Sequence, residues 1–132
     1  MRIYDYETVH NVTKPTDIET VLSKRYGAGR NSFWLSHGDK KYPAINIMVT
    51  GDISYVHYFS REGHPGFASV GNLPGLRPGE ESVFFVQNSD EPTGIMNEAV
   101  VPFRDALKAA QEFAISATKP RSLRWESLVD GE

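Results

Sequence analysis

The alternation of apolar and polar residues over residues 45–59 predicts the central element of the fold, a β-hairpin. Gly51 and Asp52 interrupt the apolar run, and a two-residue link that begins with glycine suits a tight type II′ turn. This turn would place Thr50 opposite Ile53 and fix the register of both strands. The aliphatic side chains that this register gathers on one face, and that we expect to be buried, are Ile45, Ile47, Val49 and Val56.

The opposite face of the hairpin is amphipathic, because it carries Met48, Tyr55 and His57. These side chains could meet either a helix or a partner. Strands at 32–36, 44–50 and 53–59 would form an antiparallel meander. A further strand at 82–87 is apolar on both faces, which is typical of a strand inside a sheet.

Two helices are predicted from apolar spacing and end signals. Thr16 and Glu19 form the pattern of a capping box, followed by apolar residues at helical spacing up to Tyr26, and Gly27 is expected to end this helix of about three turns. Pro102 is placed for the first turn of the second helix. The apolar stripe of that helix consists of Phe103, Ala106, Leu107, Ala110, Phe113, Ala114 and Ala117.

The remaining segments are connections and short strands. Residues 2–12 have weak strand character, and residues 123–128 are expected to fold back on the core as a last strand or turn. The connection 60–81 is rich in glycine and proline, with room for a short strand at 67–70, and residues 88–94 form a turn-rich loop. The predicted fold class is therefore α+β: an antiparallel sheet, a meander of about five to six strands, with two main helices packed on it.

Composition narrows the function classes. A chain of 132 residues with 39% hydrophobic residues fits one domain, residues 1–132. A net charge of −3 argues against a general nucleic-acid binder, and no apolar run is long enough to cross a membrane. The absence of cysteine and of a signal-like N-terminus predicts a cytoplasmic protein without disulfides.

No residue pattern gives positive evidence for an enzyme. The histidines, His10, His37, His57 and His64, lack metal-ligand spacing, so we expect no metal and no cofactor. His57 reads as a half-buried residue of a strand, while His64 is a loop residue that is either idle or in contact with a partner. Neighbouring acids on a strand point to opposite faces and make poor catalytic pairs. They serve either solubility or an acidic rim that meets a basic partner.

Four segments carry a resemblance to a known family. They are Phe33 to Leu35 leading into Ile45 to Ile47, the hairpin Gly51 to Val56, the helix from Val101 through Phe113, and the tail Pro120 to Leu128. In the tail a proline is followed by a leucine two residues before a tryptophan and then by a closing leucine. Together these segments span about residues 16–128. The chain resembles an immunity-protein family of bacterial polymorphic toxin systems, of the type paired with nucleic-acid deaminase toxins.

The resemblance implies an antitoxin of a bacterial cytoplasm with no turnover of its own. Its partner would be a cognate toxin domain, a zinc-dependent nucleic-acid deaminase, whose active site or substrate groove it would block. Acids that face this groove would mimic phosphates, and no direct contact with nucleic acid or membrane is expected. The residues that we predict to bind the toxin are Tyr55, His57, Arg61, Glu62, His64, Phe67, Glu80, Glu81, Asp90 and Glu91.

Two other functions stay open on the sequence. One is a small-molecule-binding α+β domain or cone-shaped isomerase-like enzyme, with a pocket lined by Tyr55, His57 and Phe85. The other is a non-catalytic module with a different protein partner. A deep apolar cavity around His57 would favour the enzyme, whereas a filled sheet face with an exposed acidic rim would favour a protein partner.

Overall fold

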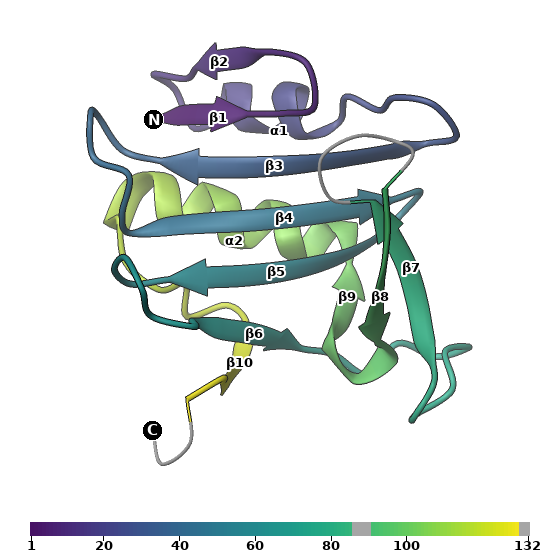
Figure 1. Cartoon of the computed structure of the whole chain (residues 1–132). Helices are drawn as coiled ribbons and strands as arrows, with labels where there is room; N and C mark the ends of the chain where they lie inside the picture. The colour runs from purple at the N-terminus through teal and green to yellow at the C-terminus, as the bar shows by residue number, and fades with distance from the viewer. Residues whose placement is uncertain (86–90, 130–132) are drawn as a thin grey trace.

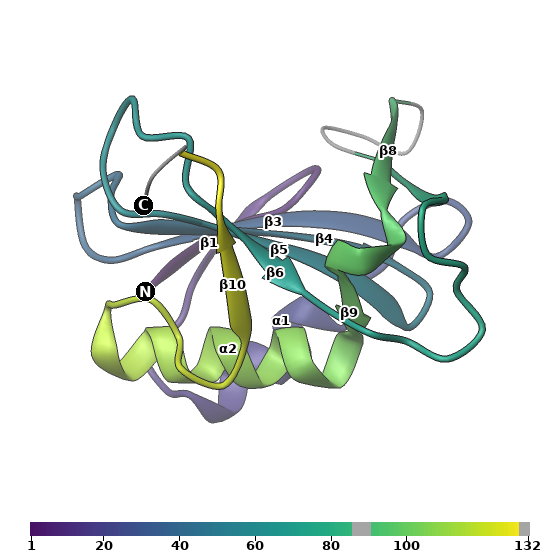
Figure 2. The same cartoon turned by 90° about the horizontal axis from the view of Figure 1, so that it is seen from below.

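The computed structural model of the protein describes residues 1–85 and 91–129. An antiparallel main sheet carries both α-helices on one side (Figures 1 and 2). Its strands follow the order β10-β6-β5-β4-β3-β1-β2, and β9 pairs with part of β5. The strands of this sheet are β1 (Arg2–Tyr4), β2 (Val9–Asn11), β3 (Arg30–Ser36), β4 (Ala44–Thr50), β5 (Ile53–Phe59), β6 (Phe67–Val70), β9 (Val100–Pro102) and β10 (Arg124–Ser127).

The central hairpin has the predicted register. Thr50 lies opposite Ile53, and Ile47 lies opposite Val56. Gly51 has a φ of +59°, a conformation that glycine adopts without the strain of a Cβ. The four aliphatic side chains expected on one face are fully buried, and they pack with α2 (Phe103–Ser116) in the main core. The α+β class is therefore confirmed, although the main sheet formed by the described residues has eight strands, more than expected.

The segment predicted as an interior strand lies outside the main sheet. Among the described residues, β7 (Glu81–Phe85) pairs with β8 (Pro92–Met96) alone, as a separate two-stranded sheet. Figure 2 shows this hairpin on the side of the main sheet opposite the helices. Val83 is 52% exposed whereas Phe84 is fully buried, so one face of the strand meets solvent. An apolar run on both faces does not by itself place a strand in a sheet interior.

The loop prediction for residues 88–94 needs a partial correction. Residues 86–90 lie outside the described residues, but Pro92, Thr93 and Gly94 belong to β8. They pair with Phe85, Phe84 and Val83. Turn-forming residues are accepted here because β8 is an edge strand, where a missing amide donor costs no ladder bond.

The first helix differs from its prediction at both ends. α1 (Thr16–Leu22) is capped by Pro15, and no side chain caps it, so the capping box between Thr16 and Glu19 is not formed. Pro15 already has helical dihedrals, which places Thr16 inside the first turn. At the other end, the backbones of Tyr26 and Arg30 exchange hydrogen bonds of 2.7 and 3.0 Å. This tight turn takes Tyr26 and Gly27 out of the helix and starts β3.

The second helix is close to its prediction. Pro102 is its N-cap, and Ala117 ends it in a left-handed conformation with φ of 54°. Ala106, Ala110 and Phe113 of the predicted stripe are fully buried. The rest of the stripe is half-buried or beyond the helix end, and Ala109 is buried in addition. The predicted strand at 67–70 and the final strand are also present, as β6 and β10.

A smaller core fills one part of the opposite face of the sheet. Met48 and Tyr55 contact Phe84 and Val100 there, with Ala68 at the side. This cluster attaches the β7–β8 hairpin and the 3₁₀ turn η1 (Asn97–Ala99) to the sheet. We call the side of the main sheet opposite α2 the outer face. On the rest of the outer face, side chains remain available for contact with another molecule.

Candidate functional site

A row of rings crosses the outer face. Trp34 of β3 stacks on Phe59 of β5 at 5.5 Å between ring centroids, and Phe59 stacks on His57 at 4.0 Å. Tyr55 meets the other edge of His57. Alternation along β3 explains the placement of Trp34, because Phe33 and Leu35 on either side of it point into the main core. The outer face therefore carries a row of aromatic rings that neither α-helix covers (Figure 2).

His57 has no ring nitrogen left for catalysis or for a ligand. Its Nε2 donates to the carbonyl oxygen of Pro65 at 2.7 Å, which leaves Nδ1 as an acceptor for the Tyr55 hydroxyl at 3.3 Å. Burial lowers the pKa of His57, and the Pro65 carbonyl only partly opposes this shift. The neutral imidazole thus joins β5 to the following loop through hydrogen bonds. This agrees with the interpretation of His57 as a half-buried strand residue.

The enzyme alternative gains no support from this geometry. Tyr55 and His57 engage one another, while the ring of Phe85 lies 3.5 Å from the guanidinium of Arg30 on another part of the molecule. A cleft of about 580 Å³ on the outer face contains none of Tyr55, His57 and Phe85 in its lining. Among residues 1–85 and 91–129, no three histidine or acidic side chains gather to hold a metal ion.

The connection between β5 and β6 presents one pair of the predicted contact residues. Arg61 and Glu62 are exposed, whereas His64 is 8% exposed. The Nδ1 of His64 accepts the amide of Gly66 at 2.9 Å, and its ring stacks on Phe67 at 5.6 Å. His64 therefore shapes the loop, and Arg61 and Glu62 are the predicted contact residues that the loop leaves exposed.

Phe67 is a partly buried residue of the fold. It packs against the main core, and the amine of Lys119 lies 3.9 Å above its ring. Of the predicted contact residues, four are mainly structural in this position: Tyr55, His57, His64 and Phe67. Their role toward a partner would be to hold the exposed residues in place.

The predicted acidic residues lie beside the β7–β8 hairpin. Glu80 and Glu81 are exposed at the start of β7, and Glu91 is exposed just before β8; Asp90 lies outside the described residues. Glu80 makes a surface ion pair of 3.9 Å with Arg77. Because β7 begins where β8 ends, Glu81 pairs with Met96 at one end of the hairpin and Glu91 lies at the other end. The three described acids, Glu80, Glu81 and Glu91, therefore lie at both ends of the hairpin and do not form one cluster.

The segment before β7 is held by hydrogen bonds to two polar side chains of η1, the buried Asn97 and the exposed Glu98. Asn97, 7% exposed, donates to the carbonyl oxygen of Arg77 at 2.9 Å and accepts from the Ser82 hydroxyl at 2.5 Å. The carboxylate of Glu98 accepts the amide of Gly79 at 2.8 Å. Most of the long connection between β6 and β7 is therefore tied to η1, which positions the acids on the hairpin.

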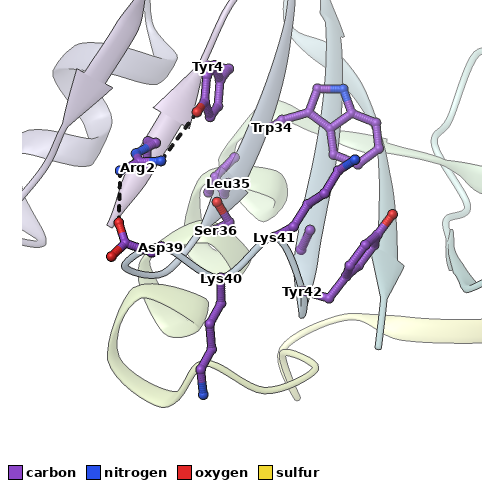
Figure 3. A pocket seen from close by; sticks show the side chains of 10 residues that line it. Arg2, Tyr4, Trp34, Leu35, Ser36, Asp39, Lys40, Lys41 and Tyr42 are labelled. Atoms are coloured by element: carbon purple, nitrogen blue, oxygen red, sulfur yellow. Dashed lines mark hydrogen bonds and ion pairs between the residues drawn. The ribbon is translucent and has the colours of Figure 1, made fainter. Parts of the chain in front are cut away.

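The sequence reasoning missed a cleft at the other end of the outer face (Figure 3). Its volume is about 580 Å³, and it lies between β1, β3 and the β3–β4 connection. Trp34 and Tyr4 are 42% and 40% exposed within it. The side chains that shape the cleft are Arg2, Tyr4, Trp34, Asp39, Lys41 and Tyr42. The signal for it was present in β3, since a tryptophan between two inward-facing apolar residues must face outward.

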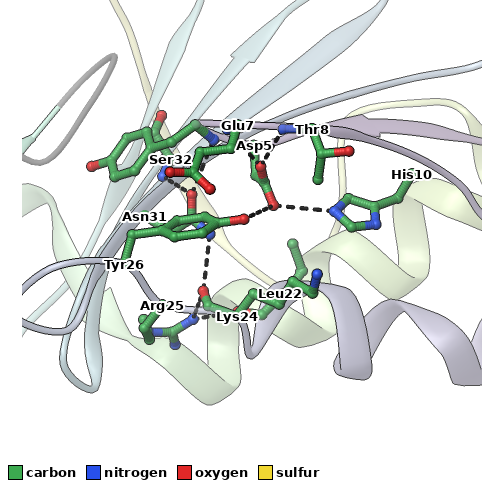
Figure 4. A network of polar contacts seen from close by, with 11 residues as sticks. Asp5, Glu7, Thr8, His10, Leu22, Lys24, Arg25, Tyr26, Asn31 and Ser32 are labelled. Carbon is green, nitrogen blue, oxygen red and sulfur yellow. Dashed lines mark hydrogen bonds and ion pairs between the residues drawn. The ribbon is translucent and has the colours of Figure 1, made fainter.

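A polar network fixes the N-terminal part of the sheet (Figure 4). One carboxylate oxygen of Asp5 accepts the amides of Glu7 and Thr8, both at 2.9 Å. The other lies 3.1 Å from His10 Nε2 and accepts the Tyr26 hydroxyl at 3.2 Å. Burial alone would raise the pKa of Asp5, but the two amides and His10 outweigh burial and lower it. This arrangement holds a turn together and offers no nucleophile.

Asn31 continues this network toward α1. It is fully buried, donates to the carbonyl oxygen of Lys24 at 2.9 Å, and accepts the amide of Ser32 at 2.8 Å. Every polar atom of the Asn31 side chain is therefore used to join the α1–β3 connection to the sheet. The network is structural, so the available surface of the outer face remains the candidate site.

Comparisons with known proteins identify the family to which the sequence is similar. A sequence model of the family described as "Immunity protein Imm1" matches residues 7–127. A curated relative from Burkholderia cenocepacia (strain H111), described as "Double-stranded DNA deaminase immunity protein", is 23% identical over 124 residues. The alignment covers 94% of this chain and 97% of the relative. No helix in the described part of the chain has the length and apolar character needed to cross a membrane.

Proposed function

This chain belongs to the Imm1 family of immunity proteins, and from that premise we propose that it binds and inhibits a nucleic-acid deaminase toxin. The observation that carries the proposal is the end-to-end similarity to a protein described as an immunity protein of a double-stranded DNA deaminase. An immunity protein neutralises its toxin by binding, so the proposed activity requires no turnover by this chain. We take residues 1–132 as one binding domain that acts in the cytoplasm, where the nucleic acid of the cell is exposed to the toxin.

The outer face supplies a surface for this binding. Arg61 and Glu62 on the β5–β6 loop and Glu80, Glu81 and Glu91 at the β7–β8 hairpin all lie at exposed positions around it. A deaminase of this kind takes its base into a pocket that holds a zinc-bound water, and its nucleic-acid groove is basic. We propose that the acids of the hairpin occupy part of that groove and exclude the strand.

Magnitudes restrict what these acids can contribute. Protection from a catalytic toxin needs a dissociation constant of about a nanomolar, or about −12 kcal/mol. Exposed ion pairs contribute about 0–1 kcal/mol each, so the acids cannot supply most of this energy. Their expected effect is faster association and choice of partner. Apolar and aromatic anchors over roughly 800 Å² on each partner must supply the rest.

The proposal is tested with the purified toxin domain encoded beside this protein and a fluorescently labelled DNA substrate. Equimolar wild-type protein at 100-fold above the dissociation constant should lower the deamination rate about 10-fold, because about 90% of the toxin is then bound. A toxin that deaminates equally fast with and without the protein would contradict the proposed function.

The role of the acids is tested separately. The combined variant Glu80→Gln, Glu81→Gln, Asp90→Gln and Glu91→Gln should associate about 10-fold more slowly at low salt, with a smaller effect at high salt. A matched control neutralises Asp17 and Glu19, which are exposed on α1 on the opposite side of the sheet. Unchanged inhibition and association by the four-acid variant would rule out the acidic rim while leaving the immunity function intact.

A further inference from the structure

The cleft between β1, β3 and the β3–β4 connection keeps two aromatic rings in solvent. Among the residues that the structure describes, the strongly exposed large apolar side chains include only two aromatic ones, Tyr4 and Trp34. Both line this cleft. Tyrosine and tryptophan are the residues that interfaces use as anchors, because they bury a large area at a small cost in side-chain entropy. Because both rings are exposed at the same cleft, we expect a partner to cover this surface.

Trp34 is held in place before any partner arrives. Its ring stacks on Phe59, which stacks on His57, and His57 is fixed in turn by the carbonyl oxygen of Pro65. Interplanar angles of 27° and 15° show that these rings lie nearly parallel. A ring supported in this way loses little freedom on binding, which favours affinity.

The charge of the cleft is opposite to that of the chain. Arg2, Lys40 and Lys41 line it together with a single acid, Asp39, although the whole protein has a net charge of −3. The carboxylate of Asp39 forms an ion pair with the guanidinium of Arg2 at 3.6 Å, and Arg2 also donates a hydrogen bond to the Tyr4 hydroxyl at 3.5 Å. In Figure 3, Lys41 extends to the side of Trp34 and Tyr42, whereas Lys40 points away from both rings. The free positive charge therefore lies at the aromatic part of the cleft.

We propose that this cleft is an anchor site for an acidic segment of the partner protein, with an aromatic or aliphatic side chain against Trp34 and a carboxylate beside Lys41. The proposal rests on the proposed function and names a second contact that the sequence-predicted residues do not include. A volume of about 580 Å³ is within the range of sites that hold a few side chains. The acids of the β7–β8 hairpin would meet basic groups of the toxin, and the cleft would meet acidic ones.

Single-stranded nucleic acid is the other class of ligand that combines rings with cations. Binding of a strand needs a track of positive charge along the backbone. Here Arg2 is paired with Asp39 and Lys40 points elsewhere, so one lysine remains beside the rings. The surplus of acids over the whole chain also repels a polyanion. The observations therefore favour a protein segment.

The cleft proposal is tested with two charge variants that should change toxin affinity in different ways, one that reverses a positive charge of the cleft and one that removes its acid. The dissociation constant for a catalytically inactive toxin domain is measured by biolayer interferometry. Lys41→Glu should weaken binding about 10-fold or more, because it faces a like charge. Asp39→Ala should leave binding unchanged or tighten it up to about 5-fold, because it removes the one acid of the cleft. Both residues are exposed, so neither change should disturb the fold.

Trp34→Ala should weaken binding about 30-fold or more, the loss typical of an aromatic anchor. Its thermal unfolding is recorded in parallel to show that the variant is folded. Matched controls lie on α2, on the opposite side of the sheet: Ile115→Ala, which truncates a side chain 78% exposed, and Lys108→Glu, which reverses an exposed charge. Both controls should bind like the wild type.

The outcomes separate the two proposals. If the wild-type protein does not bind the toxin domain, the proposed function fails. If the wild type binds and Trp34→Ala and Lys41→Glu bind equally well, only the cleft proposal is overturned. It is also overturned if the isolated protein binds a fluorescein-labelled single-stranded oligonucleotide at submicromolar concentration and Trp34→Ala abolishes that binding.

Discussion

Burial of Phe84 should make a large contribution to holding the β7–β8 hairpin on the sheet. Phe84 is fully buried against Met48, Tyr55 and Val100, while its neighbour Val83 is 52% exposed. In the described part of the chain no main-sheet strand pairs with the hairpin, so side-chain contacts rather than a backbone ladder hold it there. Removing the ring leaves a cavity at the junction of two elements.

The expected cost of Phe84→Ala follows from this burial. Truncation of a buried phenylalanine costs about 3–5 kcal/mol of unfolding free energy, as lost transfer energy and cavity formation. For a chain of this size that corresponds to a fall in melting temperature of about 10 °C or more. The assay is urea unfolding followed by tryptophan fluorescence, which reports on Trp34 and Trp125. Val83→Ala, one residue away on the exposed face, is the control and should change the unfolding free energy by no more than about 0.5 kcal/mol.

Two results would refute this reasoning. Equal losses in Phe84→Ala and Val83→Ala would mean that the hairpin is not held by its buried face. A loss below about 1 kcal/mol in Phe84→Ala would mean that the second cluster contributes little to the cooperative fold. If the expected loss is found, toxin binding at 10 °C tests whether the acids of a displaced hairpin still speed association.

Three further predictions concern single residues. A Cβ at Gly71 would overlap the carbonyl oxygen of Val100, so Gly71→Ala should lower the unfolding free energy by about 1–3 kcal/mol in urea titrations. Gly75→Ala meets no neighbouring atom but has a φ of +90°, so its loss should report backbone strain without a clash. The pKa of Asp5 is lowered in the folded protein, so its ionised form stabilises the fold above about pH 4; Asp5→Asn should cost about 1.5–3 kcal/mol at pH 7, and a difference from wild type that fails to shrink as the pH falls below about 4 would contradict this. Burial lowers the pKa of His57, so below about pH 6.5 the unfolded chain binds a proton at this residue more readily than the folded protein does. The unfolding free energy of the wild type should therefore fall between pH 7 and 5 more steeply than that of His57→Gln. Parallel curves for the two proteins would exclude His57 as the cause.

Much of the central architecture was readable from local pattern. The Gly51–Asp52 turn and the alternation around it defined the register of β4 and β5, because a slip of one residue would expose the aliphatic face. The apolar stripe of α2 predicted the buried face of that helix for the same reason of periodicity. These elements carry their own signal, since the residues that specify them are neighbours in sequence.

The ends of α1 and the location of β7 were not readable in this way. Pro15 took the cap position that the pattern gave to Thr16, and the Tyr26–Arg30 turn competed successfully with the helix. β7 looked like an interior strand because both of its faces are apolar, yet only Phe84 found a buried site. Which of two apolar faces is buried depends on the element that packs against it, and this information lies elsewhere in the chain.

The candidate site shows the same division. The sequence by itself determined which residues are acidic, aromatic or turn-forming, and the resemblance over the chain indicated the immunity family that the comparisons confirm. It predicted a contact role for His57 and His64, which stays a prediction, and the structure adds that both rings make hydrogen bonds to the backbone of the β5–β6 loop. Only the tertiary structure brought Arg2, Trp34 and Lys41 to one cleft, from a first strand, a third strand and a loop. A binding surface depends on which strands become neighbours, and strand order is set by long-range packing that local pattern does not record.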